Sequence, residues 1–113
     1  MRDVSTRRLV GRRRQLGDAL ADLGPVLRAS VIERFTQCGK GACKCMRGEK
    51  HGPAYYLTVS YAQGRTRTVY IPKTLRPVAE AWVHNYHHAV ALLEELSSIN
   101  LELLRRKAPD ADG

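Results

Sequence analysis

The sequence contains no long hydrophobic run, and this absence excludes proteins that span a membrane. No apolar stretch approaches the ~18 residues that a transmembrane helix needs. The start, MRDVSTRRLVGRRRQ, carries the positive charge of a secretory signal peptide without the apolar segment that follows in such signals. We therefore expect an intracellular, cytoplasmic protein.

The chain also lacks the usual marks of catalysis. It has no paired carboxylates in a recognisable arrangement, no phosphate-binding glycine loop with its lysine and Ser/Thr, and no nucleophile elbow. The sequence therefore predicts a protein that is not an enzyme.

Acidic residues are scarce in the first two thirds of the chain. The 113 residues, 43% hydrophobic and 27% charged, predict one globular domain with a single core. Residues 1–76 carry 16 basic and 5 acidic side chains, a net charge of +11, whereas residues 77–113 carry a net charge of −3. This asymmetry favours a polyanionic partner that approaches from one side. The alternative is that the arginines only keep a small protein soluble.

Hydrophobic periodicity predicts an α+β fold that begins with a basic helix. Leucines at helical spacing predict a helix over residues 4–23, within a basic segment 1–25 that Gly24 and Pro25 close. The leucines of this apolar stripe are Leu9, Leu16, Leu20 and Leu23. The arginines of the opposite face are Arg7, Arg8, Arg12, Arg13 and Arg14. These arginines either lie along a phosphate backbone or form the solvated face of an amphipathic helix.

A three-stranded antiparallel sheet is predicted within residues 26–73. The strands span 28–37, 54–61 and 65–71, and Val31 and Phe35 of the first share one face. The loop Ala62-Gln63-Gly64 places Tyr61 opposite Arg65. One face of the resulting hairpin is mostly apolar. The other face carries hydroxyl groups, those of Tyr56, Thr58, Ser60, Thr66, Thr68 and Tyr70. Such a face can bind phosphates and base edges, or it can be a plain solvated surface.

A heptad pattern predicts one long helix over residues 75–106, within a segment 74–107 that begins at Thr74 as N-cap. The heptad positions are Trp82, Ala89, Leu96 and Leu103, alternating with Asn85, Leu92 and Ile99. The short strands cover only the first half of such a helix, so its second half needs another apolar partner. We expect a second copy, giving a homodimer with a coiled coil, and the N-terminal helix is the alternative. Residues 108–113 form a polar tail.

Four metal-binding side chains lie in the loop between the first two strands. Cys38, Cys43, Cys45 and His51 fall within 14 residues. Three thiolates and one imidazole complete a tetrahedral zinc shell that leaves no open position, so we expect structural zinc. The surrounding basic side chains, which favour thiolates, are Lys40, Lys44, Arg47 and Lys50. A disulfide between Cys38 and Cys45, a reactive thiol, and a His51 that only caps a turn remain alternatives.

The strings CGKGACKCMRGEKHGPAYYL and GRTRTVYIPK resemble an uncharacterised bacterial family of small proteins, a domain of unknown function. The resemblance covers roughly residues 28–107 and implies no established activity. Members are often encoded near transposase or recombinase genes, so it implies a mobile-element context. The family's usual HGPYYY is HGPAYY here, with Ala54 in place of the first aromatic. The order of strands and helix also resembles small DNA-binding domains of tyrosine recombinases, which lay a three-stranded sheet in the major groove.

Together these patterns predict a zinc-stabilised nucleic-acid-binding protein, with DNA favoured over RNA, that is an accessory factor of a mobile element. The residues expected to contact the nucleic acid are Arg65, Arg67, Thr66, Thr68, Tyr56, Lys40, Lys44, Arg47, Lys50, Arg12, Arg13 and Arg14. The alternative is an adaptor that dimerises, or recruits a recombinase or transposase, through its long helix, with zinc purely structural. A thiol-based enzyme or redox sensor is a third hypothesis.

Overall fold

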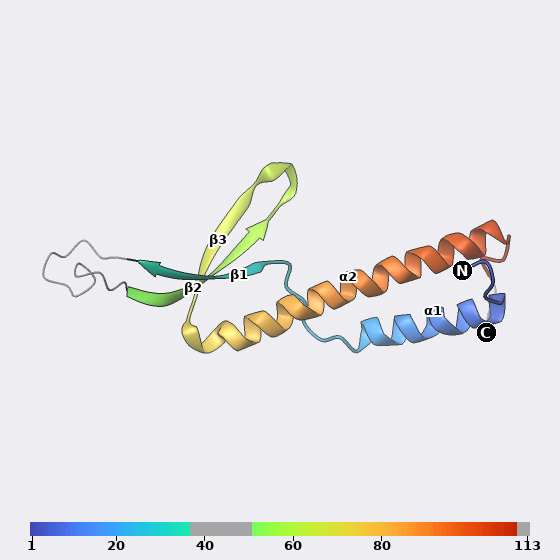
Figure 1. Cartoon of the computed structure of the whole chain (residues 1–113), viewed down its shortest axis with the longest axis horizontal. Coiled ribbons are helices and arrows are strands. Elements are labelled where there is room, and N and C mark those ends of the chain that lie inside the picture. Colours follow the sequence, from blue (N-terminus) through green and yellow to red (C-terminus); the bar gives the residue numbers. More distant parts are fainter. Residues whose placement is uncertain (37–50, 111–113) are drawn as a thin grey trace, which may run out of the picture. The chain divides into compact units, whose positions relative to one another are not determined.

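The computed structural model describes residues 1–36 and 51–110. Its elements are α1 (Thr6–Ala21), β1 (Ser30–Thr36), β2 (His51–Ser60), η2 (Ala62–Gly64), β3 (Thr66–Ile71), η3 (Lys73–Leu75) and α2 (Arg76–Arg105) (Figure 1). The predicted α+β fold is confirmed, with its N-terminal helix, three-stranded antiparallel sheet and long C-terminal helix. Neither of the described α-helices is long and apolar enough to cross a membrane.

The chain divides into two compact units. The helical unit comprises Met1–Val26 and His84–Gly113, and the sheet unit comprises Leu27–Val83. Each unit has its own cluster of buried hydrophobic side chains. The expectation of a single core is therefore wrong. The physical reason is the length of α2, whose 30 residues extend about 45 Å and so carry a separate cluster on each part of the helix.

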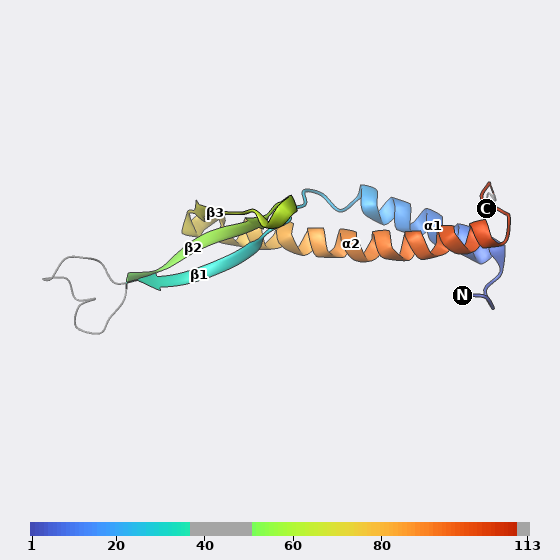
Figure 2. The ribbon, with the colours of Figure 1, turned by 90° about the horizontal axis from the view of Figure 1, so that it is seen from above.

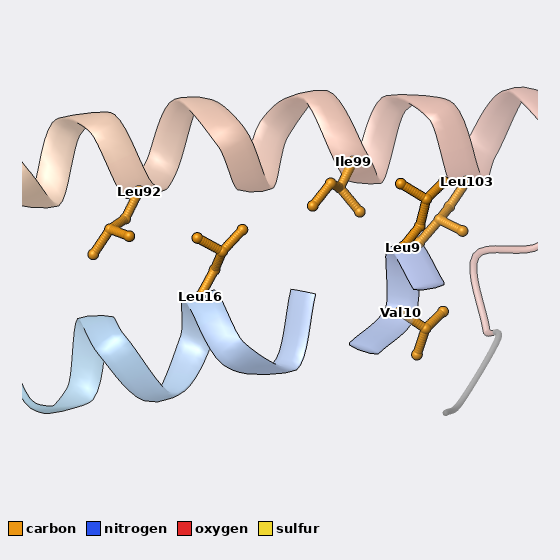
Figure 3. Close-up of a cluster of buried hydrophobic side chains, with 6 residues drawn as sticks. All are labelled: Leu9, Val10, Leu16, Leu92, Ile99 and Leu103. Atoms are coloured by element: carbon orange, nitrogen blue, oxygen red, sulfur yellow. The ribbon is translucent and has the colours of Figure 1, made fainter. Parts of the chain in front are cut away.

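In the helical unit, α1 lies antiparallel beside the second part of α2, as Figures 1 and 2 both show. The buried core contains three side chains from each helix: Leu9, Val10 and Leu16 of α1, and Leu92, Ile99 and Leu103 of α2 (Figure 3). Leu20, Leu23 and Leu96 pack against this core. The predicted apolar stripe of α1 thus meets the predicted heptad face of α2. The partner of that face is α1 of the same chain, the alternative to a second copy.

Polar contacts fix the N-terminal end of α1. Ser5 is the N-cap, and its Oγ accepts a hydrogen bond from the backbone N–H of Arg8 at 3.2 Å. Arg106, just beyond the end of α2, donates to Thr6 Oγ1 at 3.1 Å and to the Met1 carbonyl at 3.1 Å. The beginning of α1 and the end of α2 are therefore joined directly.

At the same end of the helical unit, the Glu102 carboxylate is bound by two arginines of the chain. It accepts hydrogen bonds from Arg105 at 2.5 Å and from Arg106 at 2.7 Å. These bonds hold the pKa of the Glu102 carboxyl at about 2. Since an unfolded glutamate titrates near ~4.3, the charged carboxylate stabilises the folded chain above that pH. Its contribution is lost as the pH falls through about 2.

In the sheet unit, the strands follow the order β1-β2-β3 and both pairings are antiparallel. The predicted hairpin register is confirmed, with Tyr55 opposite Ile71 and Val59 opposite Arg67. The backbone N–H of Tyr61 donates to the carbonyl of Arg65 at 2.7 Å and closes the loop. Within the loop, Gln63 and Gly64 both have positive φ, 64° and 73°. Glycine adopts this conformation without strain, which explains its position there.

Phe35, which was predicted to share a face with Val31, is 52% exposed, and the β1–β2 register shifts beside it, between Arg34 and Thr36. Two residues of β2, at positions 52 and 53, oppose the single residue 35 there, and proline at 53 has no N–H to give to the ladder.

A correction concerns the start of α2. Thr74 lies inside η3, and α2 begins two residues later at Arg76, so Thr74 is not the residue that precedes the helix. The first turns of α2 instead contact the sheet through Ala79, which is buried with Tyr55 and Ile71. Arg76 lies 4.8 Å from the centroid of the Tyr55 ring. Arg76 is therefore held against the sheet core.

Candidate nucleic-acid interface

The strand register gathers polar side chains on the face of the sheet opposite its buried cluster. Residues directly opposite each other in an antiparallel pair lie on the same face. Tyr55 and Ile71 belong to the core face, so Tyr56 and Tyr70 belong to the other one. We call this second face the hydroxyl face. Its members are Ser30, Ile32 and Arg34 of β1, Ala54, Tyr56, Thr58 and Ser60 of β2, and Thr66, Thr68 and Tyr70 of β3.

An arginine and two tyrosines form a cluster on the hydroxyl face. The Cζ atom of Arg34 lies 5.2 Å from the centroid of the Tyr56 ring. The Tyr56 and Tyr70 rings meet edge to face, with centroids 5.7 Å apart and planes inclined by 71°. Tyr56 is half-buried, whereas Tyr70 is 61% exposed. Tyr56 therefore lies between a guanidinium group and the exposed ring of Tyr70.

Further guanidinium groups belong to the other end of the sheet, at the β2–β3 hairpin tip. Arg28 Nη2 donates to the Ser60 carbonyl at 2.7 Å. Arg67 is exposed and lies opposite Val59, on the core face, whereas Thr66 and Thr68 lie on the hydroxyl face. The register thus divides the predicted contact residues of the hairpin between its two faces.

Two of the predicted α1 arginines make contacts inside the helical unit. Arg12 donates to both carboxylate oxygens of Glu95, at 2.6 and 3.0 Å. This pairing lowers the pKa of Glu95, chiefly through the hydrogen bond. Arg13 donates to Asn100 Oδ1 at 3.2 Å. Both side chains therefore link α1 to α2. Arg14 is exposed, as is Arg12.

The cysteine-rich loop lies outside the described residues, and with it the predictions for Cys38, Cys43, Cys45, Lys40, Lys44, Arg47 and Lys50. Of the four expected metal ligands, only His51 has a backbone position, at the first residue of β2 and opposite Thr36. Within residues 1–36 and 51–110, no three His, Cys, Asp or Glu side chains are grouped so that they could hold a metal ion.

Sequence reasoning missed Arg34 and Arg28 as members of the candidate site. The signal for Arg34 was the alternation of β1, in which Ile32 and Arg34 share the face opposite Val31. Arg28 contacts the Ser60 carbonyl, thirty-two residues away in the sequence, and no local sequence pattern indicates this contact.

Comparison with known proteins identifies a family. A family model described as a domain of unknown function, DUF6788, matches residues 6–81. The match includes α1 and the whole sheet, so it begins earlier and ends earlier than the predicted span of 28–107. Searches of curated proteins and of solved structures found no match. Because the family model covers more than half of the chain, this protein belongs to the DUF6788 family of domains of unknown function.

Proposed function

We propose that this chain binds nucleic acid, and DNA in particular, through the hydroxyl face of its sheet. The observation that carries the proposal is the cluster of Arg34, Tyr56 and Tyr70. An exposed aromatic ring such as that of Tyr70 is a platform on which a base stacks. The Arg34 guanidinium, which lies over the neighbouring Tyr56 ring, supplies positive charge on the same face for a phosphate. A purely structural cluster would not need a tyrosine that is 61% exposed.

The remainder of the hydroxyl face suits the same ligand. Serine and threonine hydroxyls donate to phosphate oxygens and to base edges, and Thr66 and Thr68 are exposed there. Sheets of two or three strands enter the major groove of DNA in known protein families. The net charge of +11 over residues 1–76 supplies the long-range attraction to a polyanion. Nothing in this arrangement requires a reaction to be catalysed.

We further propose that Cys38, Cys43, Cys45 and His51 hold a structural zinc ion. Support comes from the β1–β2 ladder, in which Thr36 is paired with His51 at the base of the loop. Cys38 follows Thr36 by two residues in the sequence. A Cys3His set fits zinc, and such a site supplies order to a loop that contains almost no apolar side chains.

The mobile-element context rests on the loop signature, CGK with two further cysteines followed by HGP, and stays a proposal. It favours an accessory factor that binds DNA beside a recombinase or transposase. Ala54, which replaces the first aromatic residue of the usual HGPYYY string, lies on the hydroxyl face opposite Arg34. The proposed interface therefore depends on the tyrosines at positions 56 and 70 for its aromatic surface.

The experiment that tests DNA binding is fluorescence anisotropy with a random duplex, a single-stranded DNA and a single-stranded RNA between ~50 and 300 mM salt. We expect binding to DNA whose log affinity falls linearly with log salt concentration. Tighter binding to RNA than to DNA would identify RNA as the preferred ligand. No binding at the lowest salt concentration would overturn the proposal. The alternative hypothesis, a protein-interaction adaptor, would then be favoured.

The arginines of the hairpin tip are expected to contribute to this salt dependence from beyond the hydroxyl face, since Arg67 lies on the core face. Replacing Arg65 or Arg67 with alanine should weaken binding and reduce the slope of log affinity against log salt by about 1 for each phosphate that the variant no longer neutralises. Arg105→Ala removes the same charge from a residue engaged with Glu102, and it serves as the matched control. Unchanged slopes for both tip variants would exclude the tip from the interface.

Removal of one zinc ligand is expected to remove the metal and to loosen the sheet where Thr36 is paired with His51. Cys45→Ser protein should contain no zinc by elemental analysis, while the parent contains about one ion per chain. Its sheet amides should exchange faster with solvent, because Thr36 and His51 then lose the support of the closed loop. A folded variant that retains its metal would contradict a four-ligand site.

A further inference from the structure

The sheet unit contains a small apolar pocket on the core face of its sheet. Leu57 of β2, Ile71 of β3 and Ala79 of α2 line it, and Ile71 and Ala79 are buried. Leu57 and Ile71 share the core face because they alternate along their strands with the tyrosines of the hydroxyl face. The pocket therefore lies on the side of the sheet opposite the proposed nucleic-acid interface.

Exposed side chains complete the lining of the pocket. Leu75, Val78 and Trp82 are 49%, 42% and 40% exposed. Leu27 lines the pocket as well, and its backbone N–H donates to the Trp82 carbonyl at 3.0 Å. Large exposed apolar side chains around a concave apolar surface are typical of the centre of a protein interface.

The size and chemistry of the pocket limit what it can hold. Its volume is about 160 Å³, and all of its lining residues are hydrophobic. An apolar protein cavity of ~150 Å³ holds one benzene molecule, whereas sites for free small molecules usually measure ~300–1,000 Å³ and include polar groups that orient the ligand. The pocket therefore suits one phenyl-sized side chain that is oriented by the chain to which it belongs.

The charge around the pocket favours an acidic partner. The described part of the sheet unit carries six lysine and arginine side chains against two glutamates. Arg67 lies on the core face at the position diagonal to Leu57, from which a long side chain reaches the lining of the pocket. Lys73 follows Ile71 by two residues. Both cations are exposed, and within the described residues neither side chain has an ion pair or hydrogen bond.

We propose that this pocket is a docking site for a protein partner that inserts one phenyl-sized apolar side chain flanked by carboxylates. The apolar side chain fills the pocket, and the partner's backbone covers Val78 and Trp82. The flanking carboxylates pair with Arg67 and Lys73, whose charges are otherwise uncompensated. The proposal does not rest on nucleic-acid binding, because the pocket and the hydroxyl face lie on opposite sides of the sheet.

Fluorescence of Trp82, the only tryptophan of the chain, measures occupancy of the pocket directly. The probe is a capped pentapeptide with one phenylalanine between two aspartates on each side. We expect saturable binding to the full chain and emission at shorter wavelength, because the peptide covers a ring that is 40% exposed. A peptide with alanine in place of the phenylalanine should bind at least about tenfold more weakly. A peptide with lysines in place of the aspartates should also bind more weakly, since like charges repel.

A charge placed in the pocket should abolish this binding without unfolding the chain. Val78→Glu should weaken binding of the phenylalanine peptide at least about tenfold, and its helical circular dichroism should be retained because residue 78 is exposed. Ala81→Glu introduces the same charge at an exposed position of α2 that does not line the pocket. This control should bind the peptide within about twofold of the parent. Leu75→Glu repeats the test if Val78→Glu fails to fold.

Four results overturn the proposal. Equal binding of the phenylalanine and alanine peptides would show that the pocket is not occupied. Equal binding of the aspartate and lysine peptides would exclude an acidic partner, and full affinity in the folded Val78→Glu protein would place the contact elsewhere. Absence of peptide binding is the fourth result, and a response of Trp82 to benzene would then assign the pocket to free apolar molecules.

Discussion

Ile99→Ala is expected to lower the free energy of unfolding of the helical unit by about 3 kcal/mol. Ile99 is 1% exposed and lies in the buried core with Leu92 and Leu103 (Figure 3). The variant loses the transfer free energy of three carbon atoms and leaves a cavity that two packed helices cannot close. Because small domains are stabilised by only ~5–15 kcal/mol, this loss is large.

Urea unfolding monitored by circular dichroism measures the change, and hydrogen exchange locates it. Amides of α1 and of residues 84–105 should lose most protection, since they share the cluster that contains Ile99. Val26→Ala removes apolar atoms at a half-exposed position of the same unit and should cost less than about 0.5 kcal/mol. A loss below about 1 kcal/mol for Ile99→Ala would contradict a core centred between α1 and α2.

Tyr70→Ala is expected to weaken the binding of single-stranded DNA by about five- to thirty-fold, equivalent to about 1–2 kcal/mol of lost base stacking. Tyr70 is the exposed ring of the cluster with Tyr56 and Arg34, and its removal opens no buried cavity. The free energy of unfolding should therefore change far less than the affinity. Anisotropy at one fixed salt concentration measures the effect.

Tyr70→Phe separates stacking from hydrogen bonding at the same position. It keeps the ring and removes only the hydroxyl, so affinity close to that of the parent would indicate stacking. A loss equal to that of Tyr70→Ala would assign the interaction to the hydroxyl instead. Unchanged affinity in both variants would remove Tyr70 from the proposed interface and weaken the assignment of the hydroxyl face.

Local patterns predicted the hairpin and the helices well. The three-residue loop determines which residues of β2 and β3 face each other. The pairing of Tyr55 with Ile71 therefore followed from the length of the hairpin loop alone. The stripe of Leu9 and Leu16 likewise identified the buried face of α1. Both patterns depend on residues that are close in sequence.

The contacts that local patterns did not predict join distant parts of the chain. Phe35 follows the alternation of β1, but its exposure accompanies the irregularity at residues 52 and 53 of β2. The heptad of α2 fits α1 and a second helix equally well, and only the folded chain shows that Leu92 and Ile99 contact α1. Arg34 became part of the candidate site through Tyr56, twenty-two residues further along the chain.

Among residues 1–36 and 51–110, no further strand pairs with β1 or β3, the two edges of the sheet. The arginines of these edges affect how the sheet behaves in solution. An open edge can pair with the edge of another molecule and start aggregation, and charged side chains along it oppose that pairing. Arg34 lies on β1, and Arg67 lies on β3. The same charges that would attract a polyanion therefore also keep copies of the sheet apart. Any arginine variant that loses DNA affinity should accordingly be shown to remain free of aggregates before the loss is assigned to the interface.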